Sequence, residues 1–294
     1  MNGILPCAAD RSNVVWMSEL EPGRLVPVAR GVQRLIAPNP SLMTGPGTNT
    51  YLLGEPAVAV IDPGPSDAGH IATLQRVAPR LATIFVTHTH VDHSPGAAAL
   101  AERTGARLIG RGAPSGEHQD RSFRPAVQPQ RDQCFSLSCG ALRAIDTPGH
   151  ASNHVCYLLE SEGLLFSGDH ILDGVTPVIM PPDGVMADYL QSLRRLAAYG
   201  LRAIAPGHGR LLREPYAELE RIYAHRLRRE VKVRQALRSR GSAQLDELLA
   251  LVYDDVRPEL LPMARCSLEA HLIKLAAAGE CRCQGDSWTY APRA

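Results

Sequence analysis

The apolar residues between position 26 and about position 206 come in short runs separated by glycine, proline and polar clusters. Runs of this kind are typical of buried strands. They predict strands at 50–53, 57–61, 82–86, 107–109, 142–145, 155–159, 164–166 and 203–205. The polar segment Glu160–Gly163 suits a hairpin turn between two of these strands.

Helical spacing of apolar residues appears between the strands. It predicts helices at Ser94–Thr104 and Ala187–Tyr199. Each is followed directly by a glycine, Gly105 or Gly200, which is the residue that most often ends a helix. Strands mixed with helices in this order favour a layered α/β structure with sheets inside and helices outside.

The pattern changes after Gly209. It predicts one long arginine-rich helix, two shorter helices and a terminal hairpin, at 215–239, 242–253, 260–278 and 281–290. We expect Ser242 to be the N-cap of the second helix. Three helices followed by a hairpin are typical of a winged-helix arrangement. We therefore expect two domains, residues 1–214 and residues 215–294.

Composition sets limits on the class of protein. With 294 residues, 45% hydrophobic and 21% charged, the chain can fold as one large and one small globular domain. Its net charge of +1 gives no whole-chain argument for a nucleic-acid partner. No apolar run approaches the ~20 residues that cross a bilayer, so we expect no membrane partner. The oligomeric state leaves no signal in the sequence.

The cysteines and the N-terminus bear on the cellular compartment. Seven cysteines, an odd number without Cys-x-x-Cys spacing, are typical of reduced thiols. The first twenty residues contain Asp10, Arg11 and Glu19 and no continuous apolar stretch, which argues against a secretory signal. We therefore expect a cytoplasmic protein.

Four short segments at 87–93, 147–150, 167–170 and 206–209 place metal-ligand residue types just after predicted strands. The residues are His88, His90, Asp92, His93, His150, Asp169 and His208. Imidazole nitrogen and carboxylate oxygen suit zinc and similar metals, and seven such ligands exceed what one tetrahedral ion takes. Any single histidine could be a buried structural residue, but four converging segments favour a two-metal hydrolytic site.

Three neighbouring residues have less certain roles. Asp62 ends a predicted strand, and either orients a ligand histidine or caps a turn; we favour the first role. His154 is a candidate general acid or, equally, a structural histidine at a strand start. His170, beside Asp169, is expected to support the site or the core.

The order of the seven ligand-type residues resembles that of the metallo-β-lactamase fold superfamily. The resemblance implies an αββα sandwich with a dinuclear site at one edge. It implies that one metal is held by His88, His90 and His150, that the other is held by Asp92, His93 and His208, and that Asp169 bridges both.

A closer resemblance covers nearly the whole chain. The segments Gly47–Leu52, Met180–Gly184, Ala187–Leu190 and His225–Glu230 are similar to those of the lactamase-beta-2-like group, which joins this hydrolase domain to a small winged-helix-like domain. On this resemblance alone, Asn49 and Thr50 line the pocket. True β-lactamases of the superfamily generally have Cys or Ser at the position of Asp169, so antibiotic hydrolysis is not expected.

The expected chemistry follows from the two ions. Two divalent ions, most readily zinc but with manganese or iron as alternatives, would share a hydroxide, because metal binding lowers the pKa of water from ~15.7 toward ~7. That hydroxide attacks an electrophilic carbon or phosphorus. The family implies that Asp92 both binds the second metal and accepts a proton from the water.

Three functions remain open. The closest resemblance implies cleavage of single-stranded RNA, and the basic stretch Arg221–Arg240 could contact phosphates, although a solvated interdomain helix explains it somewhat better. The second function is hydrolysis of a thioester or other acyl ester, as in glyoxalase-II-like enzymes. The third is a winged-helix nucleic-acid-binding protein with a structural metal site, which open metal positions argue against. A basic face continuous with the metal cleft favours RNA, and an apolar pocket under Ile171–Met186 favours acyl substrates.

Overall fold

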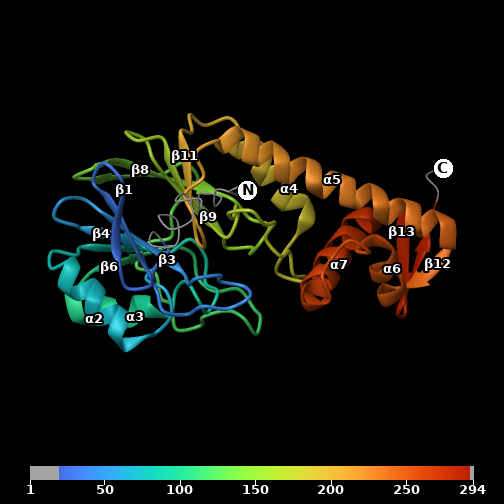
Figure 1. The fold of residues 1–294 in the computed structure, drawn as a ribbon, viewed down its shortest axis with the longest axis horizontal. Helices are drawn as coiled ribbons and strands as arrows, with labels where there is room; N and C mark the ends of the chain where they lie inside the picture. Colours follow the sequence, from blue (N-terminus) through green and yellow to red (C-terminus); the bar gives the residue numbers. More distant parts are fainter. Residues whose placement is uncertain (1–19, 292–294) are drawn as a thin grey trace, which may run out of the picture.

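A computed structural model describes residues 20–291. They form a two-sheet sandwich and a smaller α/β unit, joined by one long helix (Figure 1). The residues that argued against a secretory signal lie outside the described range. Among residues 20–291, none of the helices combines the length and the apolar character needed to cross a bilayer.

The first sheet has the strand order β1-β2-β3-β4-β5-β6. Its strands are β1 (Leu25–Ala29), β2 (Val32–Ile36), β3 (Asn49–Leu53), β4 (Ala59–Ile61), β5 (Thr83–Phe85) and β6 (Arg107–Ile109). The first four are antiparallel, whereas β4, β5 and β6 are parallel and are connected through α2 (Ala68–Val77) and α3 (Gly96–Thr104). Apolar residues of both helices pack on the outer face of this sheet.

The second sheet has the order β11-β10-β9-β8-β7. Its strands are β7 (Cys134–Leu137), β8 (Gly140–Asp146), β9 (Val155–Leu159), β10 (Leu164–Gly168) and β11 (Ala203–Pro206). Strand β11 runs parallel to β10, and helix α4 (Met186–Leu196) connects them and covers the outer face.

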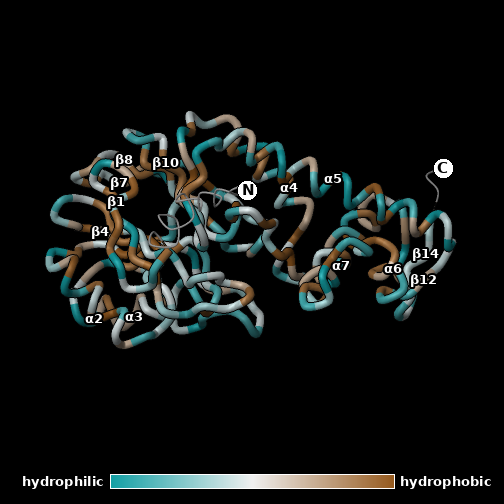
Figure 2. Tube along the Cα trace, viewed as in Figure 1, coloured by the Kyte–Doolittle hydropathy of each residue, from teal (hydrophilic) through white to brown (hydrophobic). Residues whose placement is uncertain are grey.

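The two sheets face each other across a shared apolar core. The ring of Tyr51 in β3 lies 5.1 Å from that of Phe166 in β10, and Phe85 in β5 lies 5.2 Å from Tyr157 in β9. Figure 2 shows apolar positions concentrated on the strands of the sandwich and hydrophilic positions recurring along the long helix. The expected αββα sandwich is confirmed.

The smaller unit contains α5 (Pro215–Arg240), β12 (Ser242–Gln244), α6 (Leu245–Val252), a short 3₁₀ helix η1 (Pro258–Leu260), α7 (Leu261–Ala277), β13 (Cys281–Gln284) and β14 (Ser287–Tyr290). The strands form a sheet in the order β12-β14-β13, and the unit has an apolar core of its own. The winged-helix arrangement is confirmed.

The prediction that Ser242 is a helix N-cap was wrong. Ser242 instead pairs with Thr289 as the first residue of β12. The cap of α6 is Gln244, which exchanges side-chain and backbone hydrogen bonds with Glu247 in a capping box. From the sequence alone, a serine before an apolar run can be either a helix N-cap or the first residue of a strand. The choice depends on whether a strand from elsewhere in the chain pairs with it.

The apolar core under α4 extends into the smaller unit. Leu219 and Ile222 of α5 and Ala270 of α7 are buried in the same cluster as Ile204 of β11 and Leu193 of α4. The domain boundary expected at residue 215 coincides with the start of α5, and it remains a prediction because packing is continuous across it.

Candidate metal centre

Four loops at the ends of β5, β8, β10 and β11 bring the predicted ligand residues together. Two glycines make this convergence sterically feasible. Gly149, just before His150, has φ 142°, and a Cβ there would lie 2.3 Å from the Cα of Tyr189. A Cβ on Gly207 would lie 2.5 Å from Oδ1 of Asp169, so a larger residue would push into the centre.

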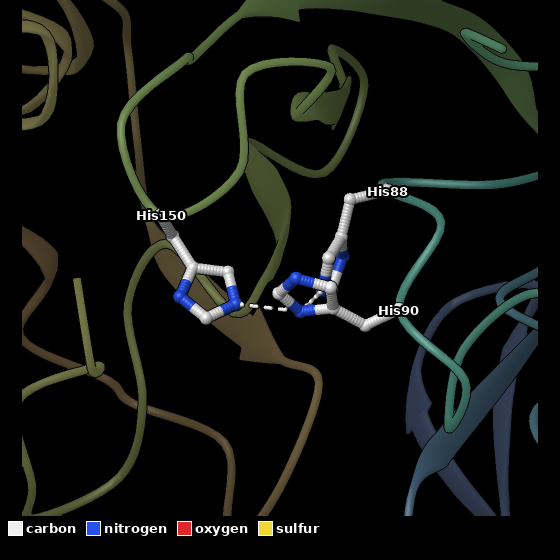
Figure 3. A group of neighbouring side chains, drawn as sticks. All are labelled: His88, His90 and His150. Atoms are coloured by element: carbon white, nitrogen blue, oxygen red, sulfur yellow. Dashed lines mark hydrogen bonds between the residues drawn. The ribbon is translucent and has the colours of Figure 1, made fainter. Parts of the chain in front are cut away.

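The first group of donors consists of three histidines whose rings point toward one another (Figure 3). His90 Nδ1 lies 3.0 Å from His88 Nε2 and 3.1 Å from His150 Nε2. On its far side, His150 places Nδ1 2.7 Å from the carbonyl oxygen of Val178. A carbonyl can only accept, so Nδ1 carries the proton and Nε2 directs a lone pair at the group.

The second group consists of Asp92, His93, Asp169 and His208. Asp169 Oδ1 lies 3.3 Å from Nε2 of His93 and 3.3 Å from Nε2 of His208. Its other oxygen, Oδ2, lies 3.8 Å from Nε2 of His150 in the first group. One carboxylate therefore faces both groups, which is the geometry that a bridging ligand requires.

Asp62 supports the second group from behind. Its carboxylate accepts hydrogen bonds from the backbone N–H and the hydroxyl of Thr87, both at 2.7 Å, and lies 3.0 Å from Nδ1 of His93. Asp62 itself has φ 51°, a left-handed conformation that is uncommon outside glycine. These contacts are those of a residue that orients a ligand histidine, the role favoured from the sequence.

The electrostatics of the first group favour neutral imidazoles. Burial lowers the pKa of His90 to about 3, and repulsion from His150 adds to the effect. Burial also lowers the pKa of His88 and of His150 below the usual value of an imidazole. A neutral imidazole has the free lone pair that a metal needs.

The second group has the opposite balance. Burial alone would lower the pKa of its histidines, but the carboxylate of Asp169 raises that of His208 to about 9, and Asp92 and Asp169 raise that of His93 as well. Burial opposes ionisation of Asp92, yet His93 and His208 hold its pKa at about 2. Binding of a divalent cation here would displace protons from the histidines.

The donor set fits divalent cations. Within each group the donor atoms lie within 4.8 Å of one another. His90 Nδ1 can share a proton with only one of its two imidazole neighbours, so hydrogen bonding alone does not satisfy the first group. Asp169 Oδ1 is buried, and no donor among residues 20–291 bonds it with good geometry. Nitrogen and oxygen donors are compatible with zinc, manganese and iron alike.

Asn49 and Thr50 do not line an open pocket. Both are fully buried. The Asn49 amide donates to the carbonyls of Pro206 (2.9 Å) and Gly209 (3.0 Å), and the Thr50 hydroxyl donates to the carbonyl of Asp62 (2.7 Å). These contacts hold the loops that carry the centre, and the pocket-lining role implied by resemblance has no support in them.

His154 and His170 lie behind the centre, and neither is exposed. The ring of His154 stacks on that of His88 with centroids 5.0 Å apart, and its Nδ1 lies 2.9 Å from the hydroxyl of Thr147. A buried ring has no access to substrate, so the placement favours the structural role of His154 over general acid catalysis. His170 packs 4.7 Å from the ring of Tyr189, consistent with a supporting role.

Comparison with known proteins agrees with this geometry. A model of the metallo-beta-lactamase superfamily matches residues 43–208. The chain belongs to the metallo-beta-lactamase superfamily. A second model, of the beta-lactamase associated winged helix domain, matches residues 245–288.

Relatives within the superfamily carry different names. The chain is 32% identical over 276 residues to the beta-lactamase-like protein 2 homolog of Drosophila melanogaster, covering 85% of this chain and 89% of that protein. It is 33% identical over 213 residues to the atrochrysone carboxyl ACP thioesterase of Aspergillus fumigatus, covering 71% of this chain and 65% of that protein.

Two solved structures have the same fold. A metallo-beta-lactamase family protein from Thermus thermophilus superposes with a TM-score of 0.74 at 23% identity, covering 91% of this chain and 100% of that one. A beta-lactamase domain protein from Burkholderia ambifaria superposes with a TM-score of 0.77 at 20% identity, covering 92% of this chain and 94% of that one. These likenesses extend over both the superfamily domain and the smaller unit.

Some groups that support this superfamily centre were missed from the sequence. Thr87 stands beside the ligands in the Thr-His-Thr-His motif and could have been found there. The carbonyl of Val178, which bonds His150, and that of Gly47, 3.2 Å from Nδ1 of His208, leave no signal because every residue has a carbonyl.

Proposed function

We propose that the protein is a metal-dependent hydrolase that uses two divalent ions to cleave an acyl ester or thioester. The observation that carries the proposal is the pair of donor groups that share the carboxylate of Asp169. When bound, the ions would make water a nucleophile near neutral pH and polarise the carbonyl under attack. His88, His90 and His150 would hold one ion; Asp92, His93 and His208 would hold the other.

Asp92 is the ligand best placed to handle a proton. Its side chain is 23% exposed, against 12% for Asp169. Its Oδ2 lies 3.2 Å from Nε2 of His208. A carboxylate that is both inside the ligand group and accessible can accept a proton from an attacking water, whereas Asp169 is enclosed and suits a purely binding role.

The surroundings of the centre favour an apolar acyl group. The large hydrophobic side chains that are exposed within residues 20–214 are Leu42, Met43, Val91, Val175, Met180 and Val185. All six belong to segments that carry ligands or bond them. Val91 stands between His90 and Asp92, and the other five belong to the segments around Gly47 and Val178, whose carbonyls contact His208 and His150. Exposed apolar side chains around a site typically mark a binding surface for apolar groups.

The basic stretch on α5 gives little support to an RNA substrate. Arg221 pairs with Glu218, Arg229 with Asp255, Lys232 with Asp254, and Arg234 with Glu280. Arg226 is buried and donates to a backbone carbonyl. Five of the eight cations between Arg221 and Arg240 are thus engaged within the protein and poorly placed to bind phosphates, which supports the interdomain-helix interpretation. The thioesterase among the relatives adds to the case for acyl chemistry.

The test compares metal-loaded protein with its Asp92→Asn variant on a panel of acyl thioesters of increasing chain length and on single-stranded RNA. We expect thioester hydrolysis that improves with chain length and is lost in the variant. Met43→Glu replaces an exposed apolar residue in the segment around Gly47 and should slow hydrolysis of long-chain thioesters. The matched substitution Ile273→Glu, at an exposed apolar position on α7, should leave this rate unchanged. Cleavage of RNA with no thioester turnover would overturn the acyl assignment.

A further inference from the structure

The segment Pro177–Ile179 lies between the metal centre and the C-terminal unit. The carbonyl of its middle residue, Val178, accepts a hydrogen bond from Nδ1 of His150, with 2.7 Å between the nitrogen and the oxygen. On the other side, the carbonyl of Pro177 accepts a hydrogen bond from Nη2 of Arg226 in α5. The backbone N–H of Ile179 lies 3.5 Å from the hydroxyl of Ser267 in α7. Helices of the C-terminal unit therefore hold both neighbours of the residue that bonds a ligand histidine.

Arg226 also contacts Tyr189, whose backbone packs against the residue before His150. Its guanidinium lies 5.4 Å from the centre of the Tyr189 ring in α4. The backbone of Tyr189 packs against Gly149, so closely that a Cβ on this glycine would lie 2.3 Å from the Cα of Tyr189. The side chain of Arg226 thus has two contacts near His150. One is with the 177–179 segment, which accepts the His150 hydrogen bond, and the other is with Tyr189, which packs against Gly149.

Among the described residues, the guanidinium of Arg226 is buried without an anionic partner. Arg226 is 2% exposed, and among residues 20–291 no carboxylate forms an ion pair with it. Burying a cation without an anionic partner is costly, and an apolar side chain of similar length would pack at lower cost. Its neighbour Arg229 differs, because it donates both to the carbonyl of Val252 and to the carboxylate of Asp255.

We propose that Arg226 is a positioning residue for the metal centre. It fixes the segment Pro177–Ile179, so that the Val178 carbonyl holds His150 in the Nδ1–H tautomer and directs the Nε2 lone pair at the first group of ligands. The C-terminal unit thereby sets the affinity of that group for its ion. This inference rests on the proposed metal-dependent function.

The test compares two matched substitutions in the full-length protein, Arg226→Met and Arg229→Met. Each removes a buried guanidinium that bonds a backbone carbonyl and lies over a tyrosine ring, but only Arg226 contacts the 177–179 segment. Metal affinity is measured by competition with a chromophoric chelator, and the His150 Nδ1–H proton by NMR of the ring N–H groups. We expect Arg226→Met to lower the affinity for one of the two ions by about tenfold or more. We also expect faster exchange of the His150 Nδ1–H proton with solvent.

Arg229→Met should lower thermal stability and leave both readouts unchanged. Arg226→Lys, which retains a donor, should recover part of the metal affinity. Equal metal affinities in the wild type and Arg226→Met, or the same loss in both methionine variants, would overturn the proposal. If Arg226→Met does not fold, the pair Arg226→Gln and Arg229→Gln, whose side chains are neutral and shorter, is judged by the same criterion. Neither readout requires a substrate, so a protein that binds two ions and hydrolyses nothing refutes the proposed function but not this inference.

Discussion

Two clusters of buried charged and titratable side chains lie in different halves of the molecule, and their neighbours differ. In the C-terminal unit, Glu230 of α5 accepts hydrogen bonds from Lys274 at 2.8 and 2.9 Å and from Arg234 at 2.7 Å. At the metal centre, the carboxylates of Asp92 and Asp169 face only histidines. The first cluster contains two permanent cations of the chain, besides His271, whose Nδ1 lies 3.5 Å from Glu230. In the second cluster the cationic partners are histidines, which can lose a proton.

The difference separates a cluster that stabilises the fold from one suited to chemistry. Lysine and arginine remain charged at any ordinary pH, so they neutralise Glu230 for as long as the protein is folded. Imidazoles can lose their protons to solvent when a divalent cation binds, so the charge of Asp169 is available for binding. The residue types around a buried carboxylate thus indicate which role it has.

The largest expected effect comes from Asp92→Asn at the metal centre. We expect turnover to fall by about 1000-fold, because an amide cannot accept the proton from the attacking water. Thermal stability should be retained, since no lysine or arginine loses its partner. The measurement is kcat with metal content determined on the same sample. Unchanged kcat at full metal occupancy would refute the assigned role.

The matching change in the other cluster is Glu230→Gln. We expect the free energy of unfolding to fall by about 2 kcal/mol, because the buried carboxylate loses the charge on which its hydrogen bonds from Lys274 and Arg234 depend, with no change in metal affinity. Urea denaturation measures the first quantity and chelator competition the second. The control is Asp246→Asn, an exposed partner of Arg265, whose loss should change stability by less than about 0.5 kcal/mol. Loss of metal binding in Glu230→Gln would remove the contrast between the clusters.

A smaller effect is expected at Asp62. Replacing it with asparagine keeps the shape but removes the negative charge 3.0 Å from Nδ1 of His93. We expect affinity for one ion to fall by about 10–100-fold, as is usual when a ligand histidine loses its orienting partner. Metal titration of Asp62→Asn measures this. An unchanged affinity would mean that Asp62 serves only to hold the turn after β4.

The smallest expected effect is on the stability of the fold at acidic pH. Burial would raise the pKa of Glu230, but His271 and Lys274 outweigh it and hold this pKa at about 2, below the usual 4.5. The unfolded chain therefore takes up this proton first as pH falls. The stabilisation is complete above about pH 4.5 and is lost progressively toward pH 2. Urea denaturation at several acidic pH values should show that the difference in free energy of unfolding between the wild type and Glu230→Gln becomes smaller as pH falls. A difference that stays constant would contradict the prediction.

Much of the fold was readable from the sequence, and two of the missed strands have identifiable causes. Strands β6 and β9 match their predicted bounds, and in β9 the reason is plain because its continuous apolar run is buried throughout. Strand β2 was missed because Arg34 interrupts its apolar run, although this arginine is buried and donates to the carbonyl of Gly209. Strand β7 alternates exposed and half-buried residues at a sheet edge, which gives only a weak signal.

The convergence of the two donor groups was predictable because their residue types and spacing are chemically restrictive. The direction of each side chain was not. His154 follows a ligand by only four residues, yet its ring turns behind His88 because Gly168 leaves space for it there. The contact between Arg226 and Pro177 joins residues 49 positions apart, and no local pattern reports such a contact.

The continuity of α5 has a practical consequence for how this protein can be divided. A chain cut at residue 214 would leave the sandwich without Leu219 and Ile222, and would open the apolar surface of α4 to water. The fragment would also lose the anchors of the 177–179 segment. Truncation experiments intended to isolate the hydrolase half would therefore yield an unstable or metal-deficient protein, and its inactivity should not be read as evidence that the winged-helix half binds substrate.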